Sequence, residues 1–482
     1  MHRRRNLTNL VLVASLAALL TGCAQAAASS VDEPEPAPHI DTAGGVYPGD
    51  TWQQATTPEE LGWSSEKLAI AKAYAEKIDS AAVMIVDDGI VVDTWGDVKR
   101  TYQCHSMRKS LISALYGIYV AEGTIDLSKT LDELGIDDKT PLTEAEKQAT
   151  VADLLRARSG VYIPAAGEAA SMKATRPERG SHAPGTFWYY NNWDFNALGT
   201  IFDQETGEEN IYQAFETHIA DPIGMQDFVP ENLHYDYESY SMHPYYGFRM
   251  STRDLARFGL LFLREGRWRD QQIIPADWVR ESTATFSQTG TDSGYGYMWW
   301  TGVKGGLFPS VQVKEHSYYA SGYRGHRVIV LPYRNVVIVH RVDTDGGEVT
   351  LEDPQIGLLL WLILDAAGET EIGDPPFIES ATGVRLTAED LHDTLAGSTV
   401  RRQEGAEEIV ASFEEDGTLP LSVGGSLIDT GTWWVEEDQL CVEFTNPDVG
   451  AGGCSYVVLD GSALTLYHLD GTLDMKFQCS QE

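Results

Sequence analysis

The spacing of apolar residues along the chain predicts a fold that mixes helices and strands. Apolar positions that recur every three or four residues are typical of amphipathic helices. Such helices are predicted at 65–78, 151–158, 196–204, 252–264 and 354–367. Short runs rich in β-branched and aromatic residues predict strands instead. Strands are predicted at 82–86, 90–95, 316–320, 326–331 and 336–342.

The order of these elements indicates an α+β fold. Strands near both ends of the region, with helices between them, predict one antiparallel sheet flanked by helices and a mostly helical second lobe. From residue 391 onward, short strand runs alternate with Asp-Gly and Gly-Gly turns, which predicts a small all-β domain of meander or barrel type. We therefore predict a main domain at 57–372, a linker rich in Pro, Gly and Asp at 373–390, and a β domain at 391–482.

The N-terminal segment has the pattern of an export signal. Three arginines precede an apolar run at 10–20, which is too short to span a bilayer as a permanent helix. The sequence Leu-Thr-Gly-Cys that ends at Cys23 resembles a bacterial lipobox, which implies cleavage before Cys23 and lipidation of its thiol. The alternative is an ordinary signal peptide with an incidental cysteine. We expect a signal peptide at 1–22, a flexible tether at 23–56, and a periplasmic protein that its lipid anchors to the outer membrane.

Charge narrows the range of partners. The formal net charge of the chain is -37. A surface this acidic argues against binding to nucleic acid and against adhesion to anionic lipid. The sequence leaves the oligomeric state open.

The cysteines predict one disulfide and no metal site. Cys441 and Cys454 close a short loop between strand-like runs, and export would allow them to pair. Cys104 precedes a predicted helix inside an apolar region, so we expect a buried thiol there. The chain has no Cys/His spacing suited to zinc and no phosphate-binding glycine loop. We therefore expect chemistry without a metal or a cofactor.

The first candidate for that chemistry is Ser106, followed by Lys109 three residues later. In a helix that begins around Ser106 and ends before Gly123, both side chains lie on one face. Unpaired N–H groups at a helix N-terminus would stabilise an anion beside the serine. Ser-x-x-Lys alone is weak, because Ser64 and Lys67 have the same spacing, and there we interpret Ser64 as a helix N-cap.

Two further clusters carry groups that acyl transfer needs. A phenol at Tyr190 could move a proton, and Asn192 would point the same way along an extended loop, where it could hold Lys109 and a substrate carbonyl. Tyr189 and Asn191 fit the same pattern one residue earlier, and an aromatic core loop is the alternative to a site. At a predicted strand end, the N–H of Tyr323 is a candidate oxyanion donor beside that of Ser106, although a simple bulge between strands is the alternative.

The order and separation of the three clusters resemble the serine β-lactamases and penicillin-binding-protein-like hydrolases, particularly the class C branch and its esterase relatives. The resemblance covers about residues 83–367 and includes Tyr-Gly-Tyr-Met-Trp-Trp at 295–300. It implies a β-lactamase/transpeptidase-like fold, with Ser106 as the acylated nucleophile and Lys109 as its base partner. It further implies Tyr190 as general acid/base and Asn192 as a polar partner.

The third motif departs from the lactamase pattern of Lys or His, then Thr or Ser, then Gly. The chain has Ala320, Ser321 and Gly322, so the cation that would meet a β-lactam carboxylate is missing. Arg324 or His326 could substitute for it from other positions. The departure favours a carboxylesterase or amide hydrolase that acts on a small or peptide-like acid. A β-lactamase or D-amino-acid peptidase, and a non-catalytic envelope binding protein on the same scaffold, are the alternatives.

Overall fold

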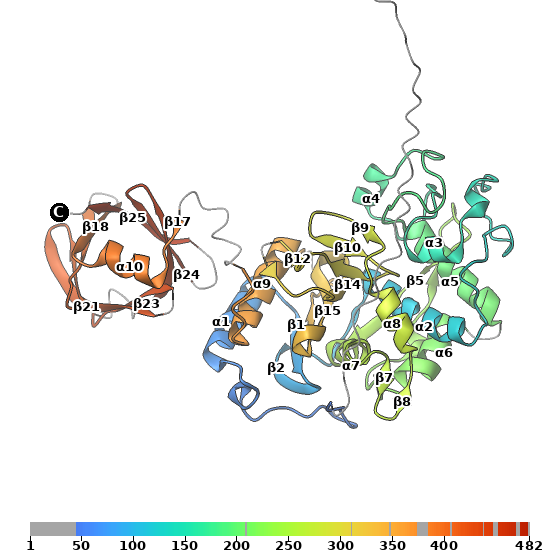
Figure 1. Ribbon diagram of the computed structural model, residues 1–482, viewed down its shortest axis with the longest axis horizontal. Helices are drawn as coiled ribbons and strands as arrows, with labels where there is room; N and C mark the ends of the chain where they lie inside the picture. The colour runs from blue at the N-terminus through green and yellow to red at the C-terminus, as the bar shows by residue number, and fades with distance from the viewer. Residues whose placement is uncertain are drawn as a thin grey trace, which may run out of the picture. The chain divides into compact units, whose positions relative to one another are not determined.

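The computed structural model of the protein describes residues 45–207, 210–309, 311–346, 349–373, 384–404, 407–436, 438–446, 452–468 and 473–480 (Figure 1). The expected signal peptide, the lipidation site at Cys23 and the first part of the expected tether lie outside the described residues. Within the described part of the chain, no helix is long and apolar enough to cross a membrane.

One eight-stranded antiparallel sheet lies at the centre of the main domain. Its strands are, in spatial order, β2 (Ile90–Gly96), β1 (Ala82–Asp87), β16 (Val336–Arg341), β15 (His326–Leu331), β14 (Tyr318–Gly322), β11 (Trp300–Gly302), β10 (Ser293–Tyr295) and β9 (Ser287–Gln288). The pairing of β1 with β16 joins the two ends of the domain, which confirms the predicted α+β arrangement.

Helices cover both faces of this sheet, which explains why its central strands are apolar throughout. Successive strand residues point to opposite faces. Val337 and Val339 of β16 face the core that also contains α7 (Thr252–Leu263), whereas Val336 and Ile338 face the core that contains α1 (Ser65–Lys77) and α9 (Asp353–Ala366). Helices α1 and α9 pack side by side (Figure 1).

The second lobe is mostly helical. Its helices are α2 (Arg108–Ala121), α3 (Val151–Leu155), α4 (Ala170–Thr175), α5 (Asn192–Thr206), α6 (Ile211–Phe215) and α8 (Ala276–Ser282). Two-stranded ribbons join β3 (Thr101–Gln103) to β6 (Arg249–Ser251), β4 (Tyr235–Asp236) to β5 (Tyr245–Tyr246), β7 (Arg267–Trp268) to β8 (Gln271–Gln272) and β12 (Gly306–Phe308) to β13 (Val311–Gln312).

Local hydrogen bonds explain where two predicted helices differ from the observed ones. Helix α3 begins with a capping box between Thr150 and Asp153, and it ends at Leu155, three residues before the predicted end. Helix α5 begins four residues earlier than predicted because the side chain of Asn191 accepts a hydrogen bond from the N–H of Trp193. Helix α3 ends early because Ala157 has a left-handed backbone with φ of 56° and the N–H of Arg158 donates to the carbonyl of Asp153, so only the correction to α5 comes from a polar cap.

The C-terminal part is an antiparallel β-barrel, as predicted. Its elements are β17 (Val384–Arg385), α10 (Ala388–Leu395), β18 (Ser398–Glu404), β19 (Glu407–Phe413), β20 (Thr418–Val423), β21 (Ser426–Glu436), β22 (Gln439–Glu443), β23 (Gly452–Asp460), β24 (Ala463–His468) and β25 (Leu473–Ser480). Strand β24 pairs with both β25 and β23, which closes the sheet. Leu391 and Leu395 of α10 lie in its core. A disulfide joins Cys441 to Cys454 across β22 and β23.

Two expected boundaries differ from the structure. The described end of the expected tether, residues 45–56, is packed: Tyr47 contacts the ring of Trp268, and Gly49 accepts a hydrogen bond from Arg257. In the expected linker 373–390, residues 374–383 lie outside the described residues, but β17 and the start of α10 already belong to the barrel. Backbone hydrogen bonds to strands that are distant in sequence also hold these segments: the N–H of Ala55 donates to the carbonyl of Val91, and β17 pairs with β23. Such contacts leave no repeat in the sequence that would reveal them.

Candidate active site

The nucleophile Ser106 lies in a single 3-10 turn, His105–Met107, directly before α2. The sequence had placed it at the start of the α-helix itself. His105 has a left-handed backbone with φ of 49°, an uncommon conformation for a residue with a side chain. Its Nε2 lies 2.8 Å from Thr344 Oγ1 and its ring contacts Tyr323 and His326, so tertiary contacts hold the turn.

Lys109 and Tyr190 meet Ser106 within hydrogen-bonding distance. Lys109 Nζ donates to Ser106 Oγ at 2.8 Å and to the Tyr190 hydroxyl at 2.7 Å. Lys109 is buried, and burial lowers the pKa of its amine well below the usual value, helped by the positive charge of Arg108. Burial raises the pKa of Tyr190 to about 12. Both pKa shifts favour an uncharged amine beside a protonated phenol.

The loop before α5 decides which tyrosine faces the serine. The Tyr189 hydroxyl donates to the carbonyl of Met172 at 2.7 Å, and the Asn191 side chain caps α5. Only the pair Tyr190 and Asn192 therefore lines the cavity with Ser106. Asn192 Nδ2 donates to the carbonyl of Gly167 at 2.8 Å, so this amide holds the cavity wall. Its Oδ1 has no hydrogen-bond partner within the described part of the chain, so the expected contact with Lys109 is not made.

The end of β14 packs directly on the turn that carries Ser106. A Cβ atom on Gly322 would lie 2.7 Å from the carbonyl oxygen of Cys104 and 3.3 Å from Met107 Cγ, which leaves room only for glycine. Ser321 and Tyr323 line the same cavity. The third motif therefore lies where the sequence analysis expected it, and Cys104 is buried as expected.

The cavity at Ser106 has a volume of about 1150 Å³. Arg324 and Arg327 both line its wall, but neither occupies the position of the missing cation, where the chain has Ala320. Arg327 donates to two carbonyls and pairs with Asp353 at 2.6 Å. His326 is buried, and burial holds its pKa well below the usual value, so it is neutral. Among the described residues, no group of three or more His, Cys, Asp or Glu side chains could hold a metal ion.

Comparison with known proteins now identifies the family. The sequence model described as "Beta-lactamase" matches residues 67–360, more than half of the chain. The chain belongs to the β-lactamase family. No curated protein matches the chain.

Several solved structures are similar to this chain at low sequence identity. A Bacillus anthracis protein assigned as a 6-aminohexanoate-dimer hydrolase is 19% identical, with a TM-score of 0.50 over 67% of this chain and 87% of that one. A class C β-lactamase mutant is 14% identical, with a TM-score of 0.46 over 63% of this chain and 98% of that one. EstCE1, a hydrolase with promiscuous acyltransferase activity, is 14% identical, with a TM-score of 0.46 over 65% and 99%.

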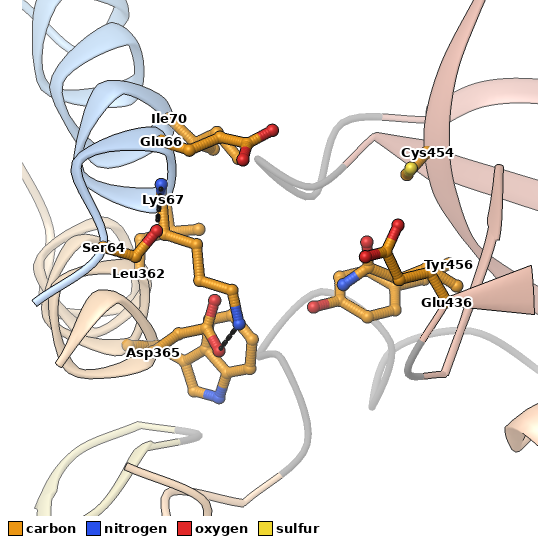
Figure 2. Close-up of a pocket in the computed structure, with 11 residues that line it drawn as sticks. Ser64, Glu66, Lys67, Ile70, Leu362, Asp365, Glu436, Cys454 and Tyr456 are labelled. Carbon is orange, nitrogen blue, oxygen red and sulfur yellow. Dashed lines mark hydrogen bonds and ion pairs between the residues drawn. The ribbon is translucent and has the colours of Figure 1, made fainter. Parts of the chain in front are cut away.

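The second Ser-x-x-Lys sequence of this family member has a different role. Ser64 Oγ accepts a hydrogen bond from the backbone N–H of Lys67 at 3.2 Å, as an N-cap does (Figure 2). Figure 2 also shows that Lys67 Nζ turns away to pair with Asp365 at 3.2 Å. The same spacing therefore gives a helix cap on the surface and a reactive pair in the cavity.

Arg108 is a part of the site that sequence reasoning missed. Its side chain is fully buried, and its guanidinium lies 4.2 Å from the ring centre of Tyr245 and 4.0 Å from that of Tyr246. Nη2 donates to Asn196 Oδ1 at 2.8 Å, while Nε and Nη1 have no hydrogen-bond partner among the described residues. The available signal was a second charged residue, next to Lys109, at the start of a helix that is mostly apolar and buried.

Replacing Arg108 by Met should shift the pH dependence of catalysis. Without the neighbouring positive charge the pKa of Lys109 rises, so the amine becomes neutral only at higher pH. We expect the acid limb of the kcat/KM profile to move to higher pH, with roughly a fivefold loss at pH 6 and a smaller one at pH 9. Arg108→Lys, which keeps the positive charge, should leave the acid limb of the kcat/KM profile at its wild-type pH. An equal loss of kcat/KM at every pH in Arg108→Met would show that Arg108 contributes through packing alone.

Proposed function

We propose that this serine hydrolase of the β-lactamase family cleaves esters or amides through an acyl-enzyme on Ser106. The contact of Lys109 with both Ser106 and Tyr190 is the observation that supports this proposal. A binding protein would have no need to bury an amine beside a serine, since such burial costs free energy. A non-catalytic role is therefore the weaker alternative.

The proposed mechanism uses only groups of the chain and water. Neutral Lys109 accepts the proton of Ser106 as its oxygen attacks the substrate carbonyl. The backbone N–H groups of Ser106 and Tyr323 stabilise the oxyanion. The proton then passes through Tyr190 to the leaving oxygen or nitrogen, whose bond to carbon breaks and leaves an ester on Ser106. Attack by water, with the proton returning to Ser106 by the same route, releases the acid.

The cavity wall favours esters and amides without a carboxylate over β-lactams. Ala320 occupies the position of the cation, and Arg327 is already engaged by Asp353 and two carbonyls. A carboxylate placed there would lose water without gaining a free cationic partner. D-amino-acid peptidase activity is a second candidate. An amide substrate that carries no carboxylate near the reacting bond would not need the missing cation.

Turnover of two chromogenic substrates tests this preference. We expect kcat/KM for p-nitrophenyl butyrate to exceed that for a chromogenic cephalosporin by about 100-fold, since a lost charged hydrogen bond costs about 1.5–3 kcal/mol. Ser106→Ala controls for background hydrolysis. Faster turnover of the cephalosporin would make the protein a β-lactamase and reject the esterase proposal.

A further inference from the structure

A buried carboxylate with an unused oxygen lies in the wall of the Ser106 cavity. The side chain of Glu168 is only 1% exposed, and its Oε2 pairs with Arg176. Its Oε1 is buried and has no hydrogen-bond partner among the described residues. Buried ionised oxygens are normally satisfied, because an unpaired one costs free energy. Since Glu168 lines the cavity, a ligand donor is one way to satisfy this oxygen.

Hydrogen bonds fix the segment that carries Glu168 against the catalytic loop. The carbonyl of Gly167 accepts from Asn192 Nδ2 at 2.8 Å, and the carbonyl of Ala166 accepts from Asn196 Nδ2 at 3.0 Å. Asn192 is two residues from Tyr190, so the backbone next to Glu168 is tied to the loop that carries the proton donor. Such a backbone holds the carboxylate in place before a substrate arrives.

The net charge of the cavity wall is negative, like that of the Glu168 carboxylate. Five carboxylates and two guanidiniums line it. Arg327 and Asp353 neutralise each other, as do Arg176 and Glu168, which leaves three carboxylates and one guanidinium in the wall. Asp236, at the end of β4, lies 3.1 Å from His234 Nε2, and Glu238 follows two residues later. The carboxylates of Glu238 and Glu168 both raise the pKa of Tyr240, after the larger effect of burial. A concave wall with excess negative charge concentrates cations and repels anions.

We propose that Glu168, with Asp236 and Glu238, forms a subsite for a cationic group of the substrate, a primary ammonium in particular. An ammonium carries three donors and can bond to the free Oε1 while the excess carboxylates balance its charge. The substrate class is then an ester or amide that carries an ammonium group away from the reacting carbonyl. This inference rests on the proposed hydrolase function and adds the charge of the substrate to it.

Three series of p-nitrophenyl esters test the subsite. Their acyl chains of five to seven carbons end in an ammonium, a methyl or a carboxylate group. We expect the wild-type protein to show a kcat/KM about tenfold higher for the best ammonium ester than for its methyl counterpart, and the lowest value for the carboxylate. The ammonium preference should shrink as ionic strength rises. No preference, or a preference for methyl or carboxylate, would overturn the subsite, whereas no turnover in any series would reject the hydrolase function itself.

Variants locate the preference in the chain. Glu168→Gln should lower the ratio of ammonium to methyl kcat/KM about tenfold, and the double variant Asp236→Asn/Glu238→Gln on the exposed loop should lower it about twofold. Glu205→Gln is the matched control, because Glu205 pairs with Lys129 at 2.8 Å and does not line the cavity, so its ratio should equal that of the wild type. An unchanged ratio in both the Glu168 and the loop variants would overturn the proposal, even if overall activity falls. If Glu168→Gln does not fold, the proposal is tested by the kcat/KM ratio of the double variant and by the effect of ionic strength on the ammonium preference of the wild type.

Discussion

Ser106→Ala abolishes labelling by a fluorophosphonate probe and lowers ester turnover on the order of 10⁴-fold or more, which is the largest effect we expect of any substitution. The reason is that Ser106 alone supplies the oxygen that becomes acylated, while Lys109 and Tyr190 only move its proton. The measurement is probe labelling, followed by mass spectrometry of the labelled peptide in the wild-type protein. Circular dichroism should show that the variant stays folded, because the serine lies in a turn beside a cavity.

Ser64→Ala is the matched control for this variant. It removes the serine of the other Ser-x-x-Lys sequence, where the side chain caps α1. We expect full labelling and a loss of about 1 kcal/mol in the free energy of unfolding, as is common for a lost N-cap. Labelling that persists in Ser106→Ala at another serine would remove Ser106 from the mechanism.

Lys109→Met is expected to have the second largest effect, a loss on the order of 10³-fold in kcat/KM for aryl esters. Methionine fills a similar buried volume but cannot accept the serine proton. The sign of the pH effect follows from the lowered pKa of Lys109: below that pKa the amine is charged and inactive, and above it the amine is neutral and active. The wild-type acid limb should therefore be absent from the residual activity of the variant. Lys67→Met, at an amine that pairs with Asp365, should keep both rate and limb.

The leaving group separates the role of Lys109 from that of Tyr190. A p-nitrophenolate departs without a proton, whereas the nitrogen of an amide must be protonated before it leaves. If Tyr190 delivers that proton, Tyr190→Phe lowers amide hydrolysis more than aryl ester hydrolysis, while Lys109→Met lowers both. Equal losses for the two substrates in Tyr190→Phe would contradict the proton path through this phenol.

Much of the fold follows from apolar spacing alone. Strand β16 is apolar at successive positions because both of its faces are covered, and α7 shows a clear apolar stripe because it packs on one face of the sheet. The short segments were missed. Strand β17 and the start of helix α10 lie in a stretch expected as a linker, because two and eight residues are too few to show a period against a background of polar residues.

The candidate site was also predictable only in part. The sequence by itself determined that Ser106 and Lys109 share one side of a helical turn, because covalent geometry fixes a spacing of three residues. It did not determine that Tyr190, 81 positions later, reaches Lys109, or that Gly322 packs on Cys104. These two contacts depend on how the helical lobe packs against the sheet. The environment likewise came only from the tertiary structure, because desolvation depends on neighbours that are distant in sequence. Burial lowers the pKa of the Lys109 amine, and one buried oxygen of Glu168 has no hydrogen-bond partner among the described residues.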